Sequence, residues 1–444
     1  MRQYDRVLGT LAAIFCSVLL IVPALWNGFP LLQYDTGGYL ARWYEGTLVP
    51  SRAVTYGLML AAGSPMAFWP VVVLQAALTV WVIALTLRVH GFARVLPLVV
   101  TVVLLSLIST LPWLTAILLT DIFCGLSVLA FYLLLMCGEK LSAGESIGLT
   151  VLIAVSVATH SATLAVLLVL CACAIPLWLT GRVASSRFAN GLIALAIGAT
   201  IVFAANAIVA KRLAWTPGGF ALSFGRMLQD GIVKRYLDDH CPDAKLQLCA
   251  YKDELPTDAD VWFWGSPLFD KLGRFAGLDA EMETIALGSL FEYPLLQIQT
   301  AAVATVKQLF SIHTGEGVVD HVWHTYTIIE RYTPQLSSAM HAARQQKGEI
   351  SFVAINLFQY PVALIAMACL PLVVLLAARR KLPIHLGELA AACTVALAAN
   401  AFICGTLSNP HDRYGARLIW VAVFAGVITL FSVGNHLGSR RNIS

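Results

Sequence analysis

Long runs of apolar residues, separated by short polar segments, recur along most of the chain. A helix that crosses a bilayer needs about 20 mostly apolar residues, because its backbone must satisfy its own hydrogen bonds across roughly 30 Å of hydrocarbon. The pattern therefore predicts about ten transmembrane helices. They lie near residues 8–26, 69–89, 95–111, 122–137, 147–160, 162–179, 190–210, 352–378, 386–404 and 416–434.

The fifth and sixth runs form one apolar stretch that is too long for a single crossing. Thr159, His160 and Ser161 interrupt it with polar side chains, so we place a break between two helices there. Another apolar stripe at helical spacing lies between residues 293 and 310, with Gln297, Lys307 and Gln308 on the opposite face; its members are Leu295, Ile298, Ala302, Val306, Leu309 and Phe310. This stripe favours a helix lying on the membrane, with an eleventh crossing as the alternative.

The composition agrees with this pattern, since 59% of the residues are hydrophobic and 12% are charged. Such a chain is typical of an all-α, polytopic membrane protein and not of a soluble one. We expect an amino-terminal transmembrane module over residues 1–210, with a first external loop at 27–68. A mostly helical external loop domain follows at 211–351, and a carboxyl-terminal transmembrane module at 352–444. The net charge of +4 says little about partners, and we expect membrane lipids and no nucleic acid.

The distribution of basic residues predicts the orientation, because lysine and arginine in short loops resist translocation. One alternating set of segments holds Arg2, Arg6, Arg88, Arg94, Lys140, Arg182, Arg187, Arg379, Arg380, Lys381, Arg440 and Arg441. These segments are expected to be cytoplasmic, so both termini are expected to be cytoplasmic as well. The expected location of the protein is the inner (cytoplasmic) membrane. The first apolar run lacks a clean cleavage site, so we interpret it as an uncleaved anchor.

The external loop carries most of the chain's 25 acidic residues and two of its 10 cysteines, Cys241 and Cys249. The other cysteines lie in or beside apolar runs, where cysteine behaves as a small hydrophobic residue. Two cysteines this close in an oxidising compartment predict a disulfide. The alternatives are two free thiols or a metal site that includes His240.

Two acidic residues stand at the predicted external ends of apolar runs. Asp35 follows the first run, and Asp121 begins the fourth. Each has a plain structural interpretation as a helix cap, Asp35 with Thr36 and a glycine turn, and Asp121 with Thr120. The functional alternative for Asp35 is an acid at the membrane surface that accepts a proton or holds a cation. Aromatic residues at helical spacing after Asp35, from Tyr39 to Tyr44, predict a short interfacial helix.

A third polar group precedes the last apolar run, in "GTLSNPHDRYGARLIW" at residues 405–420. His411, Asp412, Arg413, Tyr414 and Arg417 are placed there on the external face. Arginine suits phosphate because its planar fork binds two oxygens at once. Arginine and tyrosine also anchor helix ends against lipid headgroups, which is the alternative interpretation.

Together these motifs resemble the type C glycosyltransferases, membrane enzymes that use polyprenyl-phosphate sugars, in their bacterial form. The resemblance rests on Asp35 after the first run, "SR" at 51–52 with "YG" at 56–57, Asp121 in "LLTDIF", and the late "HDRY". It covers the architecture of nearly the whole chain. The chain has no "WWDYG" signature, so an oligosaccharyltransferase is not implied.

The resemblance implies an inverting transferase that moves a sugar from a polyprenyl phosphate to a glycan, lipid or protein of the cell envelope. The catalytic residues would be Asp35 as the base and Asp121 as an electrostatic or substrate-holding partner, and Arg52, Arg413 and Arg417 would bind phosphate. The other candidate substrate-binding residues are Tyr56, His160, Arg226, His411, Asp412 and Tyr414. The expected donor is a polyprenyl-phosphate sugar; no cofactor is specified, and a divalent metal ion stays open.

Several features carry weaker signals. His321 and His324 in "HVWH" have a spacing that suits a metal on a helix, but loop histidines are usually just exposed. Arg226 and Asp230 are spaced as a helical ion pair. Two other classes of function remain: a lipid-linked glycan transporter or flippase, which should carry charges deep in its spans, and a non-catalytic assembly protein, which would tolerate loss of Asp35.

Overall fold

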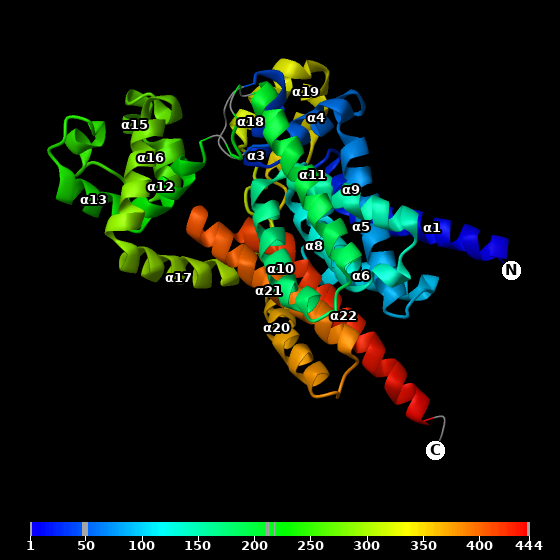
Figure 1. Ribbon diagram of the computed structural model, residues 1–444. Helices are drawn as coiled ribbons and strands as arrows, with labels where there is room; N and C mark the ends of the chain where they lie inside the picture. Colours follow the sequence, from blue (N-terminus) through cyan, green and yellow to red (C-terminus); the bar gives the residue numbers. More distant parts are fainter. Residues whose placement is uncertain (1, 47–51, 210, 212, 217, 442–444) are drawn as a thin grey trace.

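The structure, a computed structural model, describes residues 2–46, 52–209, 211, 213–216 and 218–441 (Figure 1). Helices account for 79% of the chain, and the described residues form no strand. The all-α prediction is confirmed. Ser51 of the "SR" motif, with the rest of residues 47–51, and the terminal Ser444 lie outside the described residues.

Every predicted apolar run forms a helix. They are α1 (Arg2–Leu20) with α2 (Val22–Asn27), α5 (Trp69–Val89), α6 (Val95–Ile108), α8 (Asp121–Met136), α9 (Ala143–Thr159), α10 (Ser161–Leu179), α11 (Ser185–Val209), α20 (Val353–Ala378), α21 (Ile384–Leu407) and α22 (Asp412–Arg441). Within the described ranges, six are long and apolar enough to cross a membrane: α5, α10, α11, α20, α21 and α22. The apolar parts of α1, α6, α8 and α9 are shorter.

The expected break in the longest apolar stretch is present. Helix α9 ends at Thr159 and α10 begins at Ser161, while His160 between them has an extended backbone with φ −155° and ψ 119°. The stretch therefore forms two helices, as its polar interruption predicted.

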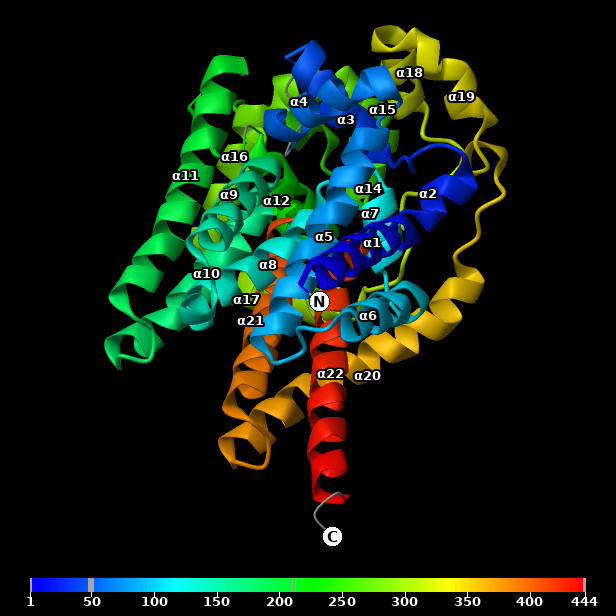
Figure 2. The same ribbon diagram turned by 90° about the vertical axis from the view of Figure 1, so that its right-hand side faces the viewer.

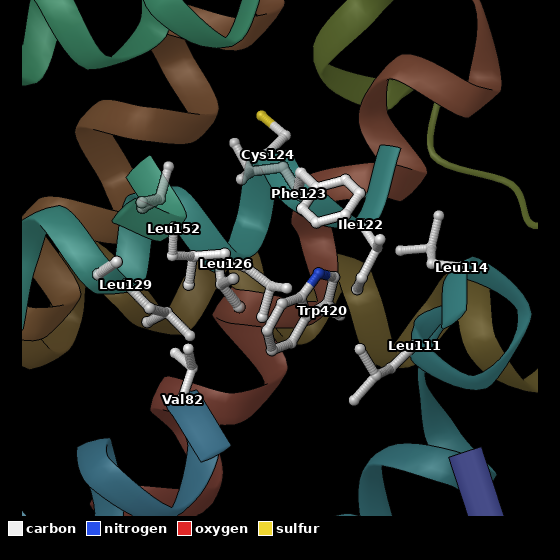
Figure 3. Packing of buried hydrophobic residues seen from close by; sticks show 14 of the residues in the cluster. Val82, Leu111, Leu114, Ile122, Phe123, Cys124, Leu126, Leu129, Leu152 and Trp420 are labelled. Atoms are coloured by element: carbon white, nitrogen blue, oxygen red, sulfur yellow. The ribbon is translucent and has the colours of Figure 1, made fainter. Parts of the chain in front are cut away.

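Helix α8 lies at the centre of the bundle, and all its residues from Asp121 to Leu135 are buried. It packs against α22, where an added Cβ at Gly125 would lie only 2.5 Å from the Nε1 atom of Trp420. Figure 3 shows the Trp420 ring among Ile122, Leu126 and Leu111. This close packing brings Asp121, the first residue of α8, near the first turn of α22.

The predicted first external loop forms α3 (Tyr34–Tyr44), α4 (Val54–Gly63) and the short 3₁₀ turn η1 (Ser64–Met66). A short helix, α7 (Leu111–Ala116), follows α6. The expectation of an interfacial helix is only partly correct, because most of α3 is buried and Arg42 is wholly enclosed. The prediction of a glycine turn after Asp35 is wrong. Gly37 lies inside α3, where a Cβ would be 2.6 Å from the Cα of Thr325 on α18 (Trp323–Tyr332). The covering helix comes from far along the chain, so local pattern did not reveal it.

The segment predicted to be external, residues 211–351, packs in two ways. Its first part has its own apolar core, which includes Phe224, Trp262 and Phe269. We call this part the external module after its predicted location; it comprises α12 (Gly219–Gln229), α13 (Ile232–His240), η3 (Gln247–Tyr251), α14 (Ala259–Gly265), α15 (Pro267–Lys271) and α16 (Arg274–Glu292). The predicted disulfide between Cys241 and Cys249 is present within it.

The second part of the segment joins the core of the bundle through residues such as Val322, Ile329 and Met340. Its elements are α18, η4 (Pro334–Leu336), α19 (Ser337–Ala342) and η5 (Gln345–Lys347). Elsewhere in the chain, the short element η2 (Gly138–Lys140) connects α8 to α9. Figures 1 and 2 show α3, α4, α18 and α19 gathered at one end of the bundle, opposite the carboxyl end of α22.

Helix α17 (Pro294–Phe310) connects the external module to the bundle and packs against α21 (Figure 1). The predicted helix is present. Its glutamines Gln297 and Gln308 are buried against the protein, whereas Leu295 and Ile298 are exposed. The apolar stripe thus faces outward, and the polar face provides the contacts to neighbouring helices.

Candidate active site

Five charged residues from distant segments converge where α3, α8 and α22 meet. Arg52 and Arg413 each ion-pair with Asp35, one on each carboxylate oxygen. The Nε atom of Arg413 lies 3.6 Å from Oδ2 of Asp121, and Nη1 of Arg417 lies 4.0 Å from Oδ1 of Asp121. We call Asp35, Arg52, Asp121, Arg413 and Arg417 the polar centre. The sequence nominated all five, and the structure brings them together.

The location of the polar centre follows from helix packing. Asp121 is the first residue of α8, and Arg413 lies in the first turn of α22. Because these two helices lie side by side, their amino-terminal ends present both side chains at one place. Arg417, one turn further along α22, continues the same face.

The polar centre is buried and has more positive than negative charge. The side chains of Asp121 and Arg417 are 2% and 0% exposed, and those of Asp35, Arg52 and Arg413 are 12–14% exposed. Burial raises the pKa of Asp35, but the charges of Arg52 and Arg413 outweigh this effect and hold the pKa well below its usual value. Asp35 is therefore ionised. Within the polar centre three arginines face two carboxylates, and Glu316 lies beside it as a third acid.

The helix-cap interpretations of the two acids are not supported. Helix α3 is capped by Gln33, whose side chain accepts a hydrogen bond from the backbone N–H of Asp35. In return, the side chain of Thr36 accepts a hydrogen bond from the backbone N–H of Gln33. At α8, Thr120 occupies the cap position without a side-chain cap bond. The Oδ1 atom of Asp121 is buried without a hydrogen-bond partner in the described structure. Both carboxylates are thus directed to the arginines rather than to helix ends.

Glu316 and His411 form a pair beside the polar centre. One oxygen of Glu316 accepts a hydrogen bond from the backbone N–H of Arg413 at 2.7 Å, and the other lies 2.7 Å from the Nδ1 atom of His411. Asp260 of the external module lies 3.7 Å from the Nε2 atom of His411. Burial lowers the pKa of His411, but Glu316 and Asp260 outweigh it and raise the pKa above its usual value.

Glu316 was missed at the sequence level, although a signal was present. It stands between Gly315 and Gly317, which both adopt positive φ angles, 98° and 76°. Glycine is the residue that adopts these angles without strain. A charged residue flanked by two such glycines in the external loop marks a tight loop that presents its side chain.

Two further residues of the "HDRY" stretch organise the surroundings. Asp412 accepts a hydrogen bond from the backbone N–H of His313 at 2.9 Å, which ties the loop before Glu316 to α22. The ring of Tyr414 lies under the guanidinium carbons of Arg413 and Arg417, at 5.2 and 5.6 Å from the ring centre. These cation–π contacts steady the two arginines. The Nε and Nη2 groups of Arg417 donate to Oδ1 of Asn400 at 3.1 and 2.6 Å, which fixes its direction.

Tyr56 and His160 lie behind the polar centre. The hydroxyl of Tyr56 donates to Gln75 at 3.0 Å, and its ring packs on Tyr39, which in turn lies under Arg52. His160, at the break between α9 and α10, is 3.5 Å from the Nη1 atom of Arg417. Tyr56 is wholly buried and His160 is half-buried, and each supports an arginine from its side of the polar centre.

Arg226 lies apart from this cluster. It pairs with Asp230 at 2.8 Å and donates to Gln297 of α17 at 3.3 Å, so it joins the external module to α17. The helical ion pair expected from the spacing is present. In "HVWH", His321 contacts Asp320 at 2.7 Å and His324 lies on α18. Among the residues that the structure describes, no cluster of three or more metal-binding side chains is present.

A cavity of about 40 Å³ adjoins Asp121, Glu316 and Arg413. This volume holds a few water molecules. A search of protein-family models, curated proteins and solved structures gives no match to this chain. The function is therefore argued from the chemistry of the polar centre.

Proposed function

We propose that the protein is a membrane glycosyltransferase of the type C class, which transfers a sugar from a polyprenyl phosphate to a cell-envelope acceptor on the external face. The observation that carries this proposal is the convergence of Arg52 and Arg413 on one carboxylate, at the amino-terminal end of the apolar helix α22. Two guanidinium groups that bind a carboxylate from both sides also fit the two unesterified oxygens of the donor's phosphodiester, and then the phosphate monoester that leaves.

The proposed reaction is a single displacement. The acceptor hydroxyl attacks the anomeric carbon of the sugar, and the bond from that carbon to the phosphate oxygen breaks. The hydroxyl proton passes to Asp35, and the polyprenyl phosphate departs with its negative charge neutralised by Arg52 and Arg413. A single displacement inverts the anomeric centre.

Asp35 must first be released from the arginines, because both of its oxygens are ion-paired in the described state. A donor phosphate competes for the same guanidinium groups. Once they turn to the phosphate, the effect that lowers the pKa of Asp35 weakens and the carboxylate becomes a better proton acceptor. Donor binding would thus prepare the base for the next step.

Asp121 supports this exchange from the interior. Its carboxylate lies 3.6 Å from Arg413 and 4.0 Å from Arg417, and it makes no hydrogen bond through Oδ1 within the described structure. It holds positive charge at the site without fixing the direction of either arginine. Asp121 is therefore an electrostatic partner, and Glu316 positions the backbone of Arg413 and the ring of His411.

The experiment that tests this function is extraction of lipid-linked glycans from cells that lack the protein. We expect a polyprenyl-phosphate sugar and the unmodified acceptor to accumulate, and both to return to normal when the wild-type gene is restored. Complementation with Asp35→Asn should leave the accumulation in place. Normal lipid and glycan profiles in the deletion strain would contradict the proposal, and rescue by Asp35→Asn would favour a non-catalytic assembly protein.

In the proposed membrane arrangement, all ten apolar helices cross the inner membrane, both termini are cytoplasmic, and residues 211–351 are external. The basic segments between the helices support it. We expect a reporter fused at Glu254 to be active outside the membrane and one fused at Ser444 to be active inside. Both reporters on one side would refute this topology.

A further inference from the structure

A buried asparagine of α21 holds Arg417 in place. Asn400 is 2% exposed, and its helix is long and apolar enough to cross a membrane. A polar side chain in such a helix costs free energy unless its hydrogen bonds are made, so it is a candidate for a functional role. Both ends of the amide of Asn400 have partners. Its Nδ2 atom donates to the backbone oxygen of Tyr414 at 2.7 Å, which directs its Oδ1 atom to the Nε and Nη2 groups of Arg417.

Arg417 is therefore a fixed charge with an uncharged partner. Its side chain is wholly enclosed, and its Nη2 group also donates to the sulfur atom of Cys404 at 3.2 Å. The amide of Asn400 accepts hydrogen bonds from Arg417 without cancelling its positive charge. The carboxylate that pairs with Arg417 is that of Asp121, at 4.0 Å from Nη1 and without a hydrogen bond to it. Arg417 thus acts on Asp121 through its charge.

Arg413 is shared between two carboxylates. Its Nη1 group pairs with Asp35, and its Nε atom lies 3.6 Å from Oδ2 of Asp121. This distance is beyond hydrogen-bond range, and in the described structure neither Nε of Arg413 nor Oδ1 of Asp121 has a hydrogen-bond partner. A movement of less than about 1 Å would bind Arg413 to Asp121. The charge of Arg417 opposes this movement, because it attracts Asp121 and repels the like charge of Arg413.

We propose that Asn400 is a positioning residue for donor binding: by holding Arg417 without cancelling its charge, it keeps Arg413 available to Asp35 and then to the donor phosphate. The inference rests on the proposed function and adds a residue that acts on the phosphate site from a distance. A carboxylate at position 400 would accept the same N–H groups of Arg417, but it would also cancel their charge. Asp121 would then draw Arg413 away from the phosphate.

The test replaces Asn400 by aspartate and measures the affinity of the purified full-length protein in nanodiscs for a long-chain polyprenyl phosphate without sugar. Aspartate has nearly the shape of asparagine, so the substitution adds a charge and keeps the packing. We expect Asn400→Asp to bind the lipid roughly tenfold more weakly, since one charge about 10 Å from an anion has an effect of this size at an effective dielectric constant of about 20.

Cys404→Asp is a second variant of the same kind, and it replaces Asn400→Asp in the test if that protein does not fold. It places a carboxylate beside Arg417 from the next turn of α21 and keeps the bond between Asn400 and Tyr414. We expect a similar loss of affinity. Asn206→Asp is the matched control, because Asn206 is also buried and its Oδ1 atom accepts from Arg42 at 3.3 Å, outside the polar centre. The control should bind as the wild type does.

A compensating substitution separates charge from structure. Adding Asp121→Asn to either aspartate variant removes one negative charge from the polar centre, so it should restore most of the lost affinity. A purely structural role of Asn400 predicts no such rescue, because asparagine at position 121 repairs no contact of Asn400. A loss that Asp121→Asn does not restore would therefore overturn the proposal.

Arg413→Ala, measured in the same series, separates this inference from the proposed function. Wild-type affinity in both aspartate variants, with weak binding by Arg413→Ala, would overturn the role of Asn400 and leave the phosphate site intact. Wild-type affinity in Arg413→Ala, or no binding of the lipid by the wild type, would overturn the proposed function and this inference together.

Discussion

Replacing Asp35 by asparagine is expected to reduce sugar transfer by about 10² to 10⁴-fold, the usual contribution of a positioned general base. The amide keeps the shape of the carboxylate but does not accept the acceptor's proton. The measurement is transfer in membranes that contain each variant at the wild-type level. Asp253→Asn is the matched control, because Asp253 is an exposed acid of the external module that pairs with Lys234.

The control should transfer at the wild-type rate. Full activity in Asp35→Asn would end the proposed role of Asp35 as the base. A loss of folded protein instead of turnover would point to a structural role, so the thermal unfolding of the variant belongs beside the activity measurement.

Replacing Arg413 by alanine is expected to weaken donor binding and turnover together. A hydrogen bond between charged groups contributes about 1.5 to 3 kcal/mol, so the loss should be roughly ten- to a hundredfold. Arg413→Lys should restore only part of it, since an ammonium group cannot reproduce the planar fork. The steady-state constants of membranes with each variant provide the measurement.

Arg331→Ala is the matched control for this series. Arg331 also pairs with a carboxylate, that of Glu45, but its side chain is 59% exposed and it lies on α18 outside the polar centre. Exposed pairs of this kind contribute about 1 kcal/mol or less. Equal losses in Arg413→Ala and Arg331→Ala would contradict a specific phosphate-binding role for Arg413.

The positions of the helices were predictable because each apolar run carries its own signal. The ten runs became helices, and the polar interruption at His160 fell between α9 and α10. The polar centre was predictable for a related reason. Helix ends on one face of a membrane present their polar residues at one level, so Asp35, Asp121 and Arg413 were nominated together despite their separation in sequence.

What was not predictable depends on contacts between distant segments. The burial of α3 is caused by α18, where Thr325 packs on Gly37. The approach of Asp260 to His411 follows from how the external module sits on the bundle. Composition predicted that residues 211–351 form one domain. In the structure, part of this segment has its own apolar core and part joins the core of the bundle, and this division depends on contacts between helices that are distant in sequence.

The competition between Asp35 and a phosphate for the same two arginines is the central claim of this account. The most direct test is the affinity for a long-chain polyprenyl phosphate of the wild type, Asp35→Asn and Arg413→Ala, measured in nanodiscs at one salt concentration. Removing the competing carboxylate should make Asp35→Asn bind more tightly than the wild type, while Arg413→Ala should bind roughly ten- to a hundredfold more weakly. An Asp35→Asn affinity equal to or weaker than that of the wild type would contradict the claim.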